Sequence, residues 1–485
     1  MSFTSSMSNA LSGLTASARS AEIVSANIAN AMTEGYGKRE IVLNSRADDR
    51  AGNGVFITGV KRIADIGIIT DRRGAEAGLA RAATISSALS KIEDVTGLPG
   101  EAGSLADRFS KFETALIAAA SQPQSEPRLA AVVQAADDIT TKFSGITDTI
   151  QDIRQDADAK IAREVDGLNT ALSKVETLNR SISRLSNSGR EASALLDQRQ
   201  QIIDSISEVI PVRQVQREKG TVALFSPTGA ILLDGRAAEF GFSKAGLVTP
   251  AQSIDNGGLS GLTMNGRSID VARSDSLIDG GRLSALFETR DRVAPSAQAD
   301  LDAVARDLIE RFQDPVIDPT LAIGDPGLFT DLGATFDPVN ELGIAGRLSL
   351  NDAVIEDAGG SVVAIRDGLQ AVNPTEVGDA SQINALIAGF GGDRTPATGP
   401  FAGIARKPTE LVADFSSTVS TNRQISEGDE LYNKSRVDTL KQQELAGGVD
   451  TDDELQKLLL VEKAYAANAR VISTLDEMLD SLLRI

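Results

Sequence analysis

The feature that most constrains this 485-residue chain is a heptad spacing of apolar residues in both terminal segments. The spacing alternates between four and three residues, which keeps one narrow apolar stripe of a helix facing a partner helix. Helices of about 30 residues are roughly 45 Å long, so each exposes a face that one antiparallel neighbour covers only in part. The N-terminal seam is Met7, Leu11, Leu14, Ala18, Ala21, Ser25, Ile28 and Met32, and the C-terminal seam is Leu458, Val461, Tyr465, Asn468, Ile472, Leu475, Leu479 and Leu482.

Periodicity alone leaves two interpretations of these seams open. Either the two helices form the hairpin core of a monomer, or they are contact surfaces of a subunit in a larger assembly. Three polar residues, Asn27, Asn30 and Asn468, lie on the otherwise apolar helices. A single Asn in a seam sets the register of packing at some cost in stability, so it suits a helix that has one packing arrangement. Tyr36 and Tyr465 are either part of this packing or ordinary core aromatics.

The composition argues against catalysis. Lys plus Arg is 48 against 68 Asp plus Glu, and the resulting net charge of −20 disfavours nucleic acid and anionic membranes as partners. The sequence has no Cys, so it has no disulfide, thiol nucleophile or thiolate metal site. It also has no His, the usual general base near neutral pH and the commonest transition-metal ligand. We therefore expect no enzyme, no catalytic residue, no cofactor and no metal site.

Two local patterns receive structural rather than chemical interpretations. The acidic run 450–454 resembles the start of a calcium loop, but Leu455 and Val461 occupy the positions of its required Gly and Glu. We predict instead that this run caps the last helix. Residues 1–9 are Ser-rich and lack the pattern of a cleaved signal peptide, and no run of about 18 apolar residues predicts a membrane span. The sequence therefore predicts a soluble protein.

Between the seams, the sequence predicts long helices. Residues 41–43 and 55–60 are strand-like runs separated by the turn Gly52-Asn53-Gly54. Helical spacing then predicts helices over 65–95, 104–120, 125–187 and 190–208, with further helices over 283–312, interrupted at Pro295, and over 409–445. The helix from Ser125, with Pro127 in its first turn, is far longer than the mean globular helix of about 11 to 12 residues. This length favours an elongated body.

We predict a mainly α fold with an inserted β domain, in an elongated multidomain chain. Residues 1–40 and 446–485 form a terminal coiled coil, which is the axial core. Residues 41–209 and 281–445 form a helical-bundle middle domain with short strands, in which 314–408 are loops with a few short strands. Residues 210–280 form a small β-rich outer domain. Because the chain goes outward and returns, both ends are expected at one pole, with Gly447-Gly448 separating the last two helices.

The exit from the first helix carries a family resemblance. Asn27-Ile28-Ala29-Asn30, followed by Thr33, Gly35-Tyr36 and Lys38, resembles the signature of bacterial flagellar axial proteins of the rod, hook and hook-associated class. Further stretches are similar to the hook-associated protein 1 family of the hook–filament junction: 195–199, 280–283 with 290–291, 448–450 with 453–454, and 464–472. The resemblance touches nearly the whole chain and is weakest at 210–280 and 314–408. Gly37 and Glu462-Lys463 depart from the family pattern, which puts their local contacts in question.

The resemblance implies a structural subunit of the bacterial flagellum that joins the hook to the filament and allows filament assembly. A hook or rod subunit is the alternative, although the middle of such a protein is expected to be nearly all β. The resemblance also implies unfolded export through the flagellar type III apparatus and a final extracellular location. The implied partners are further copies in the axial tube, the hook protein, the third hook-associated protein, and an export chaperone that holds the C-terminal segment.

The two seams then become the predicted assembly interface. We expect both ends of the free subunit to be disordered, because each helix is too poorly buried to be stable alone. On incorporation they pack against each other and against neighbouring subunits. The expected interface residues are Leu11, Leu14, Ala18, Ala21, Asn27, Ile28, Asn30, Gly35, Tyr36, Leu458, Val461, Tyr465, Asn468, Ile472, Leu475, Leu479 and Leu482.

Overall fold

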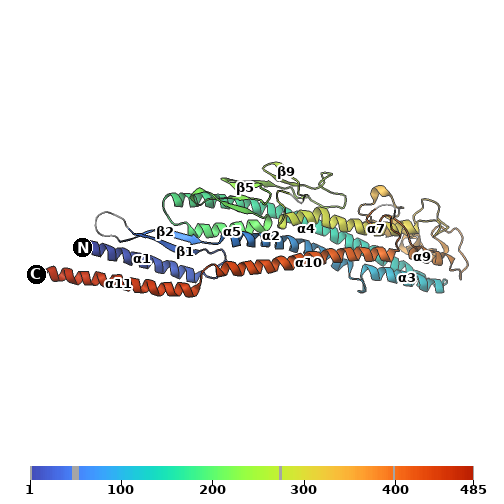
Figure 1. Cartoon of the computed structure of the whole chain (residues 1–485). Helices are drawn as coiled ribbons and strands as arrows, with labels where there is room; N and C mark the ends of the chain where they lie inside the picture. The colour runs from blue at the N-terminus through green and yellow to red at the C-terminus, as the bar shows by residue number, and fades with distance from the viewer. Residues whose placement is uncertain (1–2, 46–53, 272, 274–275, 397–398, 484–485) are drawn as a thin grey trace.

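The computed structural model describes residues 3–45, 54–271, 273, 276–396 and 399–483, except the side chain of Leu482. The chain is long and mainly helical, and its two termini lie at the same end (Figure 1). This confirms the predicted mainly α, elongated fold with small β parts. No helix of the described residues combines the length and the apolar character needed to cross a membrane.

The terminal helices pair with each other and with a β-hairpin. Helix α1 (Phe3–Ala29) runs antiparallel to α11 (Thr451–Leu483), and strands β1 (Lys38–Ser45) and β2 (Val55–Ile63) lie alongside α1 (Figure 1). The strands pair in antiparallel register from Lys38 opposite Ile63 to Ser45 opposite Val55. A two-stranded hairpin is marginally stable alone, so its stability depends on these helices and on the body. The expected turn residues Gly52 and Asn53 lie outside the described residues.

The helical body begins where this pair ends. Helix α2 (Ile66–Thr96) starts with Asp65, whose carboxylate accepts hydrogen bonds from the backbone N–H groups of Gly67 and Ile68. It packs along α10 (Pro408–Ala446). The helices approach closely at Gly78, where a Cβ would come within 2.7 Å of Asn433 Oδ1. This long antiparallel contact returns the chain from the far end of the molecule.

Helix α4 (Glu126–Asn187) confirms the long heptad prediction. Pro127 lies in its first turn as expected, whereas Ser125 holds the N-cap position without a side-chain capping bond. Because α4 presents one stripe at intervals of three and four, it contributes to two successive cores along its length. The buried apolar stripe is Leu129, Val132, Ala136, Ile139, Phe143, Ile146, Ile150, Ile153, Ala157, Ile161, Val165, Leu168, Leu172, Val175 and Ile182.

The first core surrounds the outer half of α4. Helices α3 (Leu105–Ser121), α7 (Ala294–Phe312) and α9 (Ser381–Gly391) contribute, as does the first part of α10. Phenylalanines from α3, α7 and α9 stack here, with Phe112 and Phe390 ring centroids 5.2 Å apart. Strands β10 (Phe329–Asp331) and β11 (Leu348–Leu350) form a small antiparallel pair, and α8 (Ala364–Asp367) is one turn.

The second core joins the inner half of α4 to the β strands predicted between 210 and 280. Helices α5 (Ser193–Val209) and α6 (Arg282–Glu288) complete it. A four-stranded antiparallel sheet follows the order β3 (Arg213–Gln216), β4 (Val222–Phe225), β5 (Ile231–Asp234) and β6 (Arg236–Ala237). A three-stranded sheet contains β7 (Phe240–Gly241), β8 (Leu262–Met264) and β9 (Arg267–Ile269). Both lie on one side of the helical body (Figure 1).

A buried ion pair attaches this β region to α4. Asp158 and Arg290 are both fully buried, with Arg290 Nη1 2.7 Å from Asp158 Oδ1. The other Asp158 oxygen accepts a hydrogen bond from the backbone N–H of Ala245, and Arg290 Nη2 donates to the carbonyl of Ser260. The loop that connects β7 to β8 is therefore held to the helices near both of its ends by one polar cluster.

Two local predictions differ from the structure. The stretch 314–408 was expected to be loops with a few short strands, which β10 and β11 are, but it also includes α9, which buries Ile383, Leu386 and Phe390. The predicted interruption at Pro295 is absent, because the π-helical turn Thr289–Val293 leads directly into α7 with Pro295 in its first turn.

Candidate assembly interface and its joint with the body

The last turn of α1 and the residues that follow it form a polar joint between the terminal helix pair and the body. Asn27 is its centre and is 1% exposed. Its Nδ2 donates to the Arg39 carbonyl and to Glu454 Oε2, both at 2.9 Å. Its Oδ1 accepts from Tyr36 OH at 2.9 Å and from the Arg39 backbone N–H at 3.0 Å. One amide therefore fixes α1, the exit segment, β1 and α11 relative to one another.

Glu454, on the first turn of α11, is the partner that determines how α11 meets α1. It is 1% exposed, and its Oε1 lies 2.9 Å from Lys457 Nζ and 3.6 Å from Lys38 Nζ. Burial by itself would raise the pKa of Glu454. The hydrogen bonds from Asn27 and Lys457, with the charges of Lys457 and Lys38, outweigh burial and hold that pKa below its usual value. The carboxylate is therefore ionised at neutral pH, and its contribution to stability is lost as the pH falls below about 4.5.

Tyr36 is a polar connector rather than a core aromatic. Its hydroxyl donates to Asn27, and the Arg39 guanidinium lies over its ring, 5.0 Å from the ring centroid. Burial raises the pKa of Tyr36, so the phenol stays protonated and remains a donor. The family-type Gly35-Tyr36 exit thus has a physical role in this joint.

Asp197, on α5, connects the exit segment and the hairpin to the body. It accepts from the Gly37 backbone N–H at 3.1 Å and pairs with Arg39 Nη2 at 3.0 Å and Arg62 Nε at 2.6 Å. A Cβ on Gly37 would come within 2.4 Å of Arg62 Nε, so the unusual glycine of this sequence admits the Arg62 side chain. Gly35 has a φ of +77°, which favours glycine for this turn.

A second ionic cluster joins three helices of the body beside the joint. Arg72 of α2 pairs with Glu76 at 2.7 Å, with Asp204 of α5 at 2.8 Å and with Glu444 of α10 at 2.6 Å. Burial would lower the pKa of Arg72, but these three carboxylates raise it above its ordinary value. Lys441 lies between Glu34 and Glu76, at 3.8 and 3.6 Å. Between these elements lies a groove of about 530 Å³, lined in part by the exit segment 31–36.

The break between the last two helices follows the prediction. Helix α10 ends at Gly447, whose N–H donates to the Gln443 carbonyl. Asp450 caps α11, because its Oδ1 accepts from the backbone N–H groups of Asp452 at 2.9 Å and Asp453 at 3.2 Å. The predicted capping by the acidic run is thus confirmed for Asp450, whereas Glu454 turns inward to Asn27.

The N-terminal seam lies one position away from the stripe that α1 buries within the subunit. The buried residues are Ala10, Ala16, Ser17, Ile23, Val24 and Asn27, whereas the seam residues Leu14, Ala21 and Ile28 are half-buried and Met7, Leu11, Ala18, Ser25 and Met32 are exposed. A small residue on this face of α1 allows the stripe to pack against α11, because the Asn468 side chain lies close to the Gly13 backbone. A Cβ there would meet Asn468 Nδ2 at 2.7 Å. Leu11 is 58% exposed, so the intramolecular packing covers it only in part.

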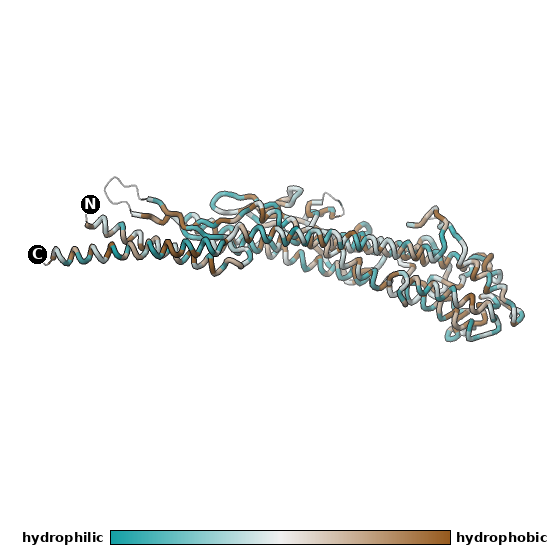
Figure 2. The backbone as a smooth tube through the Cα atoms, turned by 60° about the horizontal axis from the view of Figure 1, so that its bottom comes forward, coloured by the Kyte–Doolittle hydropathy of each residue, from teal (hydrophilic) through white to brown (hydrophobic). Residues whose placement is uncertain are grey.

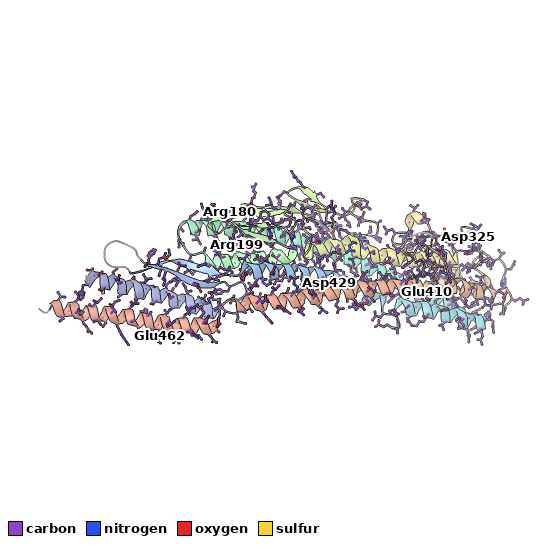
Figure 3. All side chains as sticks on the ribbon, in the orientation of Figure 1. Arg180, Arg199, Asp325, Glu410, Asp429 and Glu462 are labelled. Carbon is purple, nitrogen blue, oxygen red and sulfur yellow. The ribbon has the colours of Figure 1, made fainter. Side chains whose placement is uncertain are left out.

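The C-terminal seam is also covered only in part. Leu458, Val461, Asn468, Ile472 and Leu475 are half-buried, Tyr465 and Leu479 are exposed, and the side chain of Leu482 lies outside the described residues. Beyond the seam, α11 exposes Leu459 and Leu460 at 58% and 65%. Figure 2 shows hydrophobic positions recurring along both terminal helices, and Figure 3 shows Glu462 on α11. Asn30 and Asn468 each donate to a carbonyl one turn earlier in their own helix.

Sequence reasoning gave no role in the joint to Glu454, Asp197, Arg39 or Arg62, although Asp197 and Glu454 lie in two of the stretches that carry the family resemblance. Glu454 lies four residues before Leu458, so the C-terminal seam extended by one turn would have placed it on the packed face. The role of Asp197 depends on the distant residues Arg39 and Arg62, and no local spacing signals it.

The arrangement supplies apolar surfaces for packing. Apolar side chains remain exposed on α1, on α11 and on the hairpin, where Phe56 is 54% exposed. Among the described residues, no group of three or more acidic side chains is placed to hold a metal ion. Two long, partly covered helices fixed to a rigid body by a buried polar joint suit assembly with neighbouring subunits.

Known protein families match the two terminal segments and the helical middle of the chain separately. Residues 7–36 match the flagella basal body rod protein family, and 446–485 match the C-terminal family of the flagellar basal body rod proteins FlgE, FlgF and FlgG. Residues 89–314 match the helical domain of the flagellar hook-associated protein FlgK. Two rod-type terminal segments around a helical body define a flagellar axial protein.

Curated relatives cover nearly the whole chain. Flagellar hook-associated protein 1 of Bacillus subtilis (strain 168) is 22% identical over 94% of this chain and 93% of its own length, and that of Escherichia coli (strain K12) is 24% identical over 99% of each. The chain belongs to the flagellar hook-associated protein 1 family, which is a family of structural proteins. A solved structure of the flagellar hook junction protein FlgK from Burkholderia pseudomallei is similar over 54% of this chain and 46% of that chain, with 17% identity and a TM-score of 0.45.

Proposed function

We propose that this chain is the structural subunit that joins the flagellar hook to the filament, and that α1 and α11 make its contacts in the axial tube. The observation that carries the proposal is the incomplete cover of both terminal helices, in a chain whose terminal segments match rod-type families and whose middle matches the FlgK helical domain. A hook or rod subunit is not favoured, because residues 105–209 here are largely helical.

The exposed seam residues are the proposed assembly surface. Leu11, Ala18, Tyr465 and Leu479 are covered only in part by the intramolecular contact, so their exposed surface is available to neighbouring subunits. Burying apolar surface contributes about 25 cal/mol per Å², and this gain offsets the conformational entropy that the two helices lose when they become ordered. Because one surface of a subunit meets a different surface of the next, such contacts propagate as a helix instead of closing a dimer.

The division into domains follows as part of the proposal. The terminal segments 1–40 and 446–485 form the axial core, and 41–209 with 281–445 form the helical wall. Residues 210–280 form the outer β-rich part. The buried Asn27 joint and the Asp197 pairs support a fixed angle between core and wall, which a connector between two tubes requires.

The further partners and the route of export are also proposals. The exposed apolar face of α11 suits a chaperone that shields it before export, and the absence of cysteine suits a chain exported unfolded. Its final place is extracellular, between the hook protein and the third hook-associated protein. We propose that it acts without catalysis, since a chain without His or Cys lacks the commonest catalytic groups.

A deletion strain tests the proposal. Removing the gene is expected to leave intact hooks without filaments and to release flagellin into the medium, and the full chain is expected to restore filaments. The Leu11→Glu variant places a charge on the proposed interface and is expected not to restore filaments in this strain. The Ile323→Glu variant changes a side chain that is 96% exposed at the far end of the body and is expected to restore them. Loss of the hooks themselves, or equal behaviour of the two variants, would refute the assignment.

A further inference from the structure

A cavity of about 280 Å³ lies beneath the joint, between β2, α2, α5 and β3. Three guanidinium groups line it, from Arg62, Arg73 and Arg199. Figure 3 places Arg199 on α5 near the hairpin. The amide side chains of Gln200, Gln214 and Gln216 also line the cavity, and apolar side chains such as Ile69 and Ile203 complete its wall.

The carboxylates near this cavity are shared with arginines outside it. Asp197 pairs with both Arg62 and Arg39. Asp204 pairs with both Arg73, at 2.6 Å, and Arg72, at 2.8 Å. The three cavity arginines therefore have less than one carboxylate each, although the chain as a whole carries a net charge of −20.

Arg199 has no carboxylate within 4 Å among the described residues, although it is only 4% exposed. Among the hydrogen bonds of those residues it donates through Nη1 alone, to Asn179 Oδ1 at 2.8 Å and to the Gly220 carbonyl at 2.7 Å. Burial, followed by the charges of Arg62 and Arg73, lowers the pKa of Arg199 to about 10. A buried cation without an anionic partner is costly, and the two cations beside it add to that cost.

We propose that this cavity binds a small inorganic oxyanion, phosphate or sulfate, between Arg199 and the guanidinium groups of Arg62 and Arg73. The planar guanidinium matches the oxygen pairs of these anions, and the amide nitrogens of Gln214 and Gln216 supply neutral donors, whereas that of Gln200 already donates to Glu444. The bound anion links β2 to α2 and α5, so it stiffens the attachment of the hairpin to the body. This site goes beyond the proposed function, because assembly does not require it.

Calorimetric titration of the full-length chain with phosphate, and separately with sulfate, tests the site at constant ionic strength and neutral pH. We expect saturable binding of one anion per chain, with no saturable signal from chloride. Binding by both oxyanions or by one supports the proposal and identifies the preferred ligand. Absence of saturable binding by either would overturn it.

Two variants and a matched control localise the binding. Arg199→Gln removes the unpaired cation and is expected to weaken binding at least tenfold. Gln214→Glu places a carboxylate beside Arg73, whose Nη1 already donates to Gln214 Oε1 at 2.9 Å, so it is expected to fold and to exclude the anion. Arg154→Gln removes another buried arginine, which donates to the carbonyls of Arg290, Thr249 and Gln252 outside the cavity, and is expected to bind as the wild type does. Wild-type affinity in Gln214→Glu would place the anion elsewhere and refute the site.

Discussion

Replacing Asp197 with alanine is expected to release the β-hairpin from the body. The side chain is mostly buried, and its loss removes bonds to the Gly37 N–H, Arg39 and Arg62 at 3.1, 3.0 and 2.6 Å. At a net value of about 1 kcal/mol per partly buried bond, the hairpin attachment loses about 3 kcal/mol. Because about 1.4 kcal/mol corresponds to a factor of ten, amide exchange in β1 and β2 is expected to be up to about 100-fold faster.

Hydrogen exchange with mass spectrometry on the free full-length chain measures this change. The exchange of α4 is expected to stay unchanged, because its two cores do not depend on Asp197. Glu191→Ala is the matched control, since it removes only the surface pair with Arg19 at 2.7 Å, with side chains 31% and 44% exposed. Exposed pairs contribute roughly 0 to 1 kcal/mol, so its effect should stay below about fivefold. Equal exchange of the hairpin in the two variants would refute the role given to Asp197.

Three further predictions concern the body and the terminal pair. Asp158→Ala removes one of the two carboxylates that pair with the buried Arg290 guanidinium, while Asp291 still pairs with it at 2.8 Å, and is expected to lower the free energy of unfolding by about 1.5 to 3 kcal/mol in urea titration. Asp156→Ala, which removes a 3.8 Å surface pair between α4 and Lys91 of α2, is expected to cost less than about 1 kcal/mol. Burial raises the pKa of Asp300 from 3.8 to about 6. The contribution of Asp300 to the free energy of unfolding is therefore favourable below pH 3.8 and is lost as the pH rises through 6. Asp300→Asn is expected to stabilise the chain by about 1 to 2 kcal/mol at pH 8 and by nothing at pH 3.5. Gly13→Leu is expected to reduce filament attachment in a complemented deletion strain, because a side chain there displaces the Asn468 amide, whose Nδ2 would lie 2.7 Å from the new Cβ. Gly74→Leu, at another helical glycine where a Cβ meets nothing within 4 Å, is expected to be tolerated. Equal outcomes within any of these comparisons contradict the corresponding contact.

The sequence predicted elements whose signals are local. The apolar stripe of α4 repeats from Leu129 to Val175 at intervals of three and four, and the cap at Asp450 follows a glycine break, so spacing and capping rules sufficed. The role of Asn27 in the joint was partly predictable, because a polar residue on an otherwise apolar helix indicates that the helix packs in one register.

The remainder depends on contacts between distant segments. Which stripe α1 buries is decided by how closely α11 approaches Gly13, and apolar spacing does not reveal that distance. Helix α9 was missed because its apolar residues lie within a proline- and glycine-rich stretch, where three phenylalanines from other helices stabilise its Phe390. The cavity beside Arg199 requires β2, α2, α5 and β3 to meet, which no single segment encodes.

The central claim is that the terminal helices are completed only by neighbouring subunits. Hydrogen exchange compared between the free subunit and hook–filament junctions isolated with it tests this claim directly. We expect weak protection over Leu11–Ile28 and Leu458–Leu482 in the free subunit, and protection comparable to that of α4 after assembly. Protection of these segments in the free subunit equal to that of α4 would contradict the account.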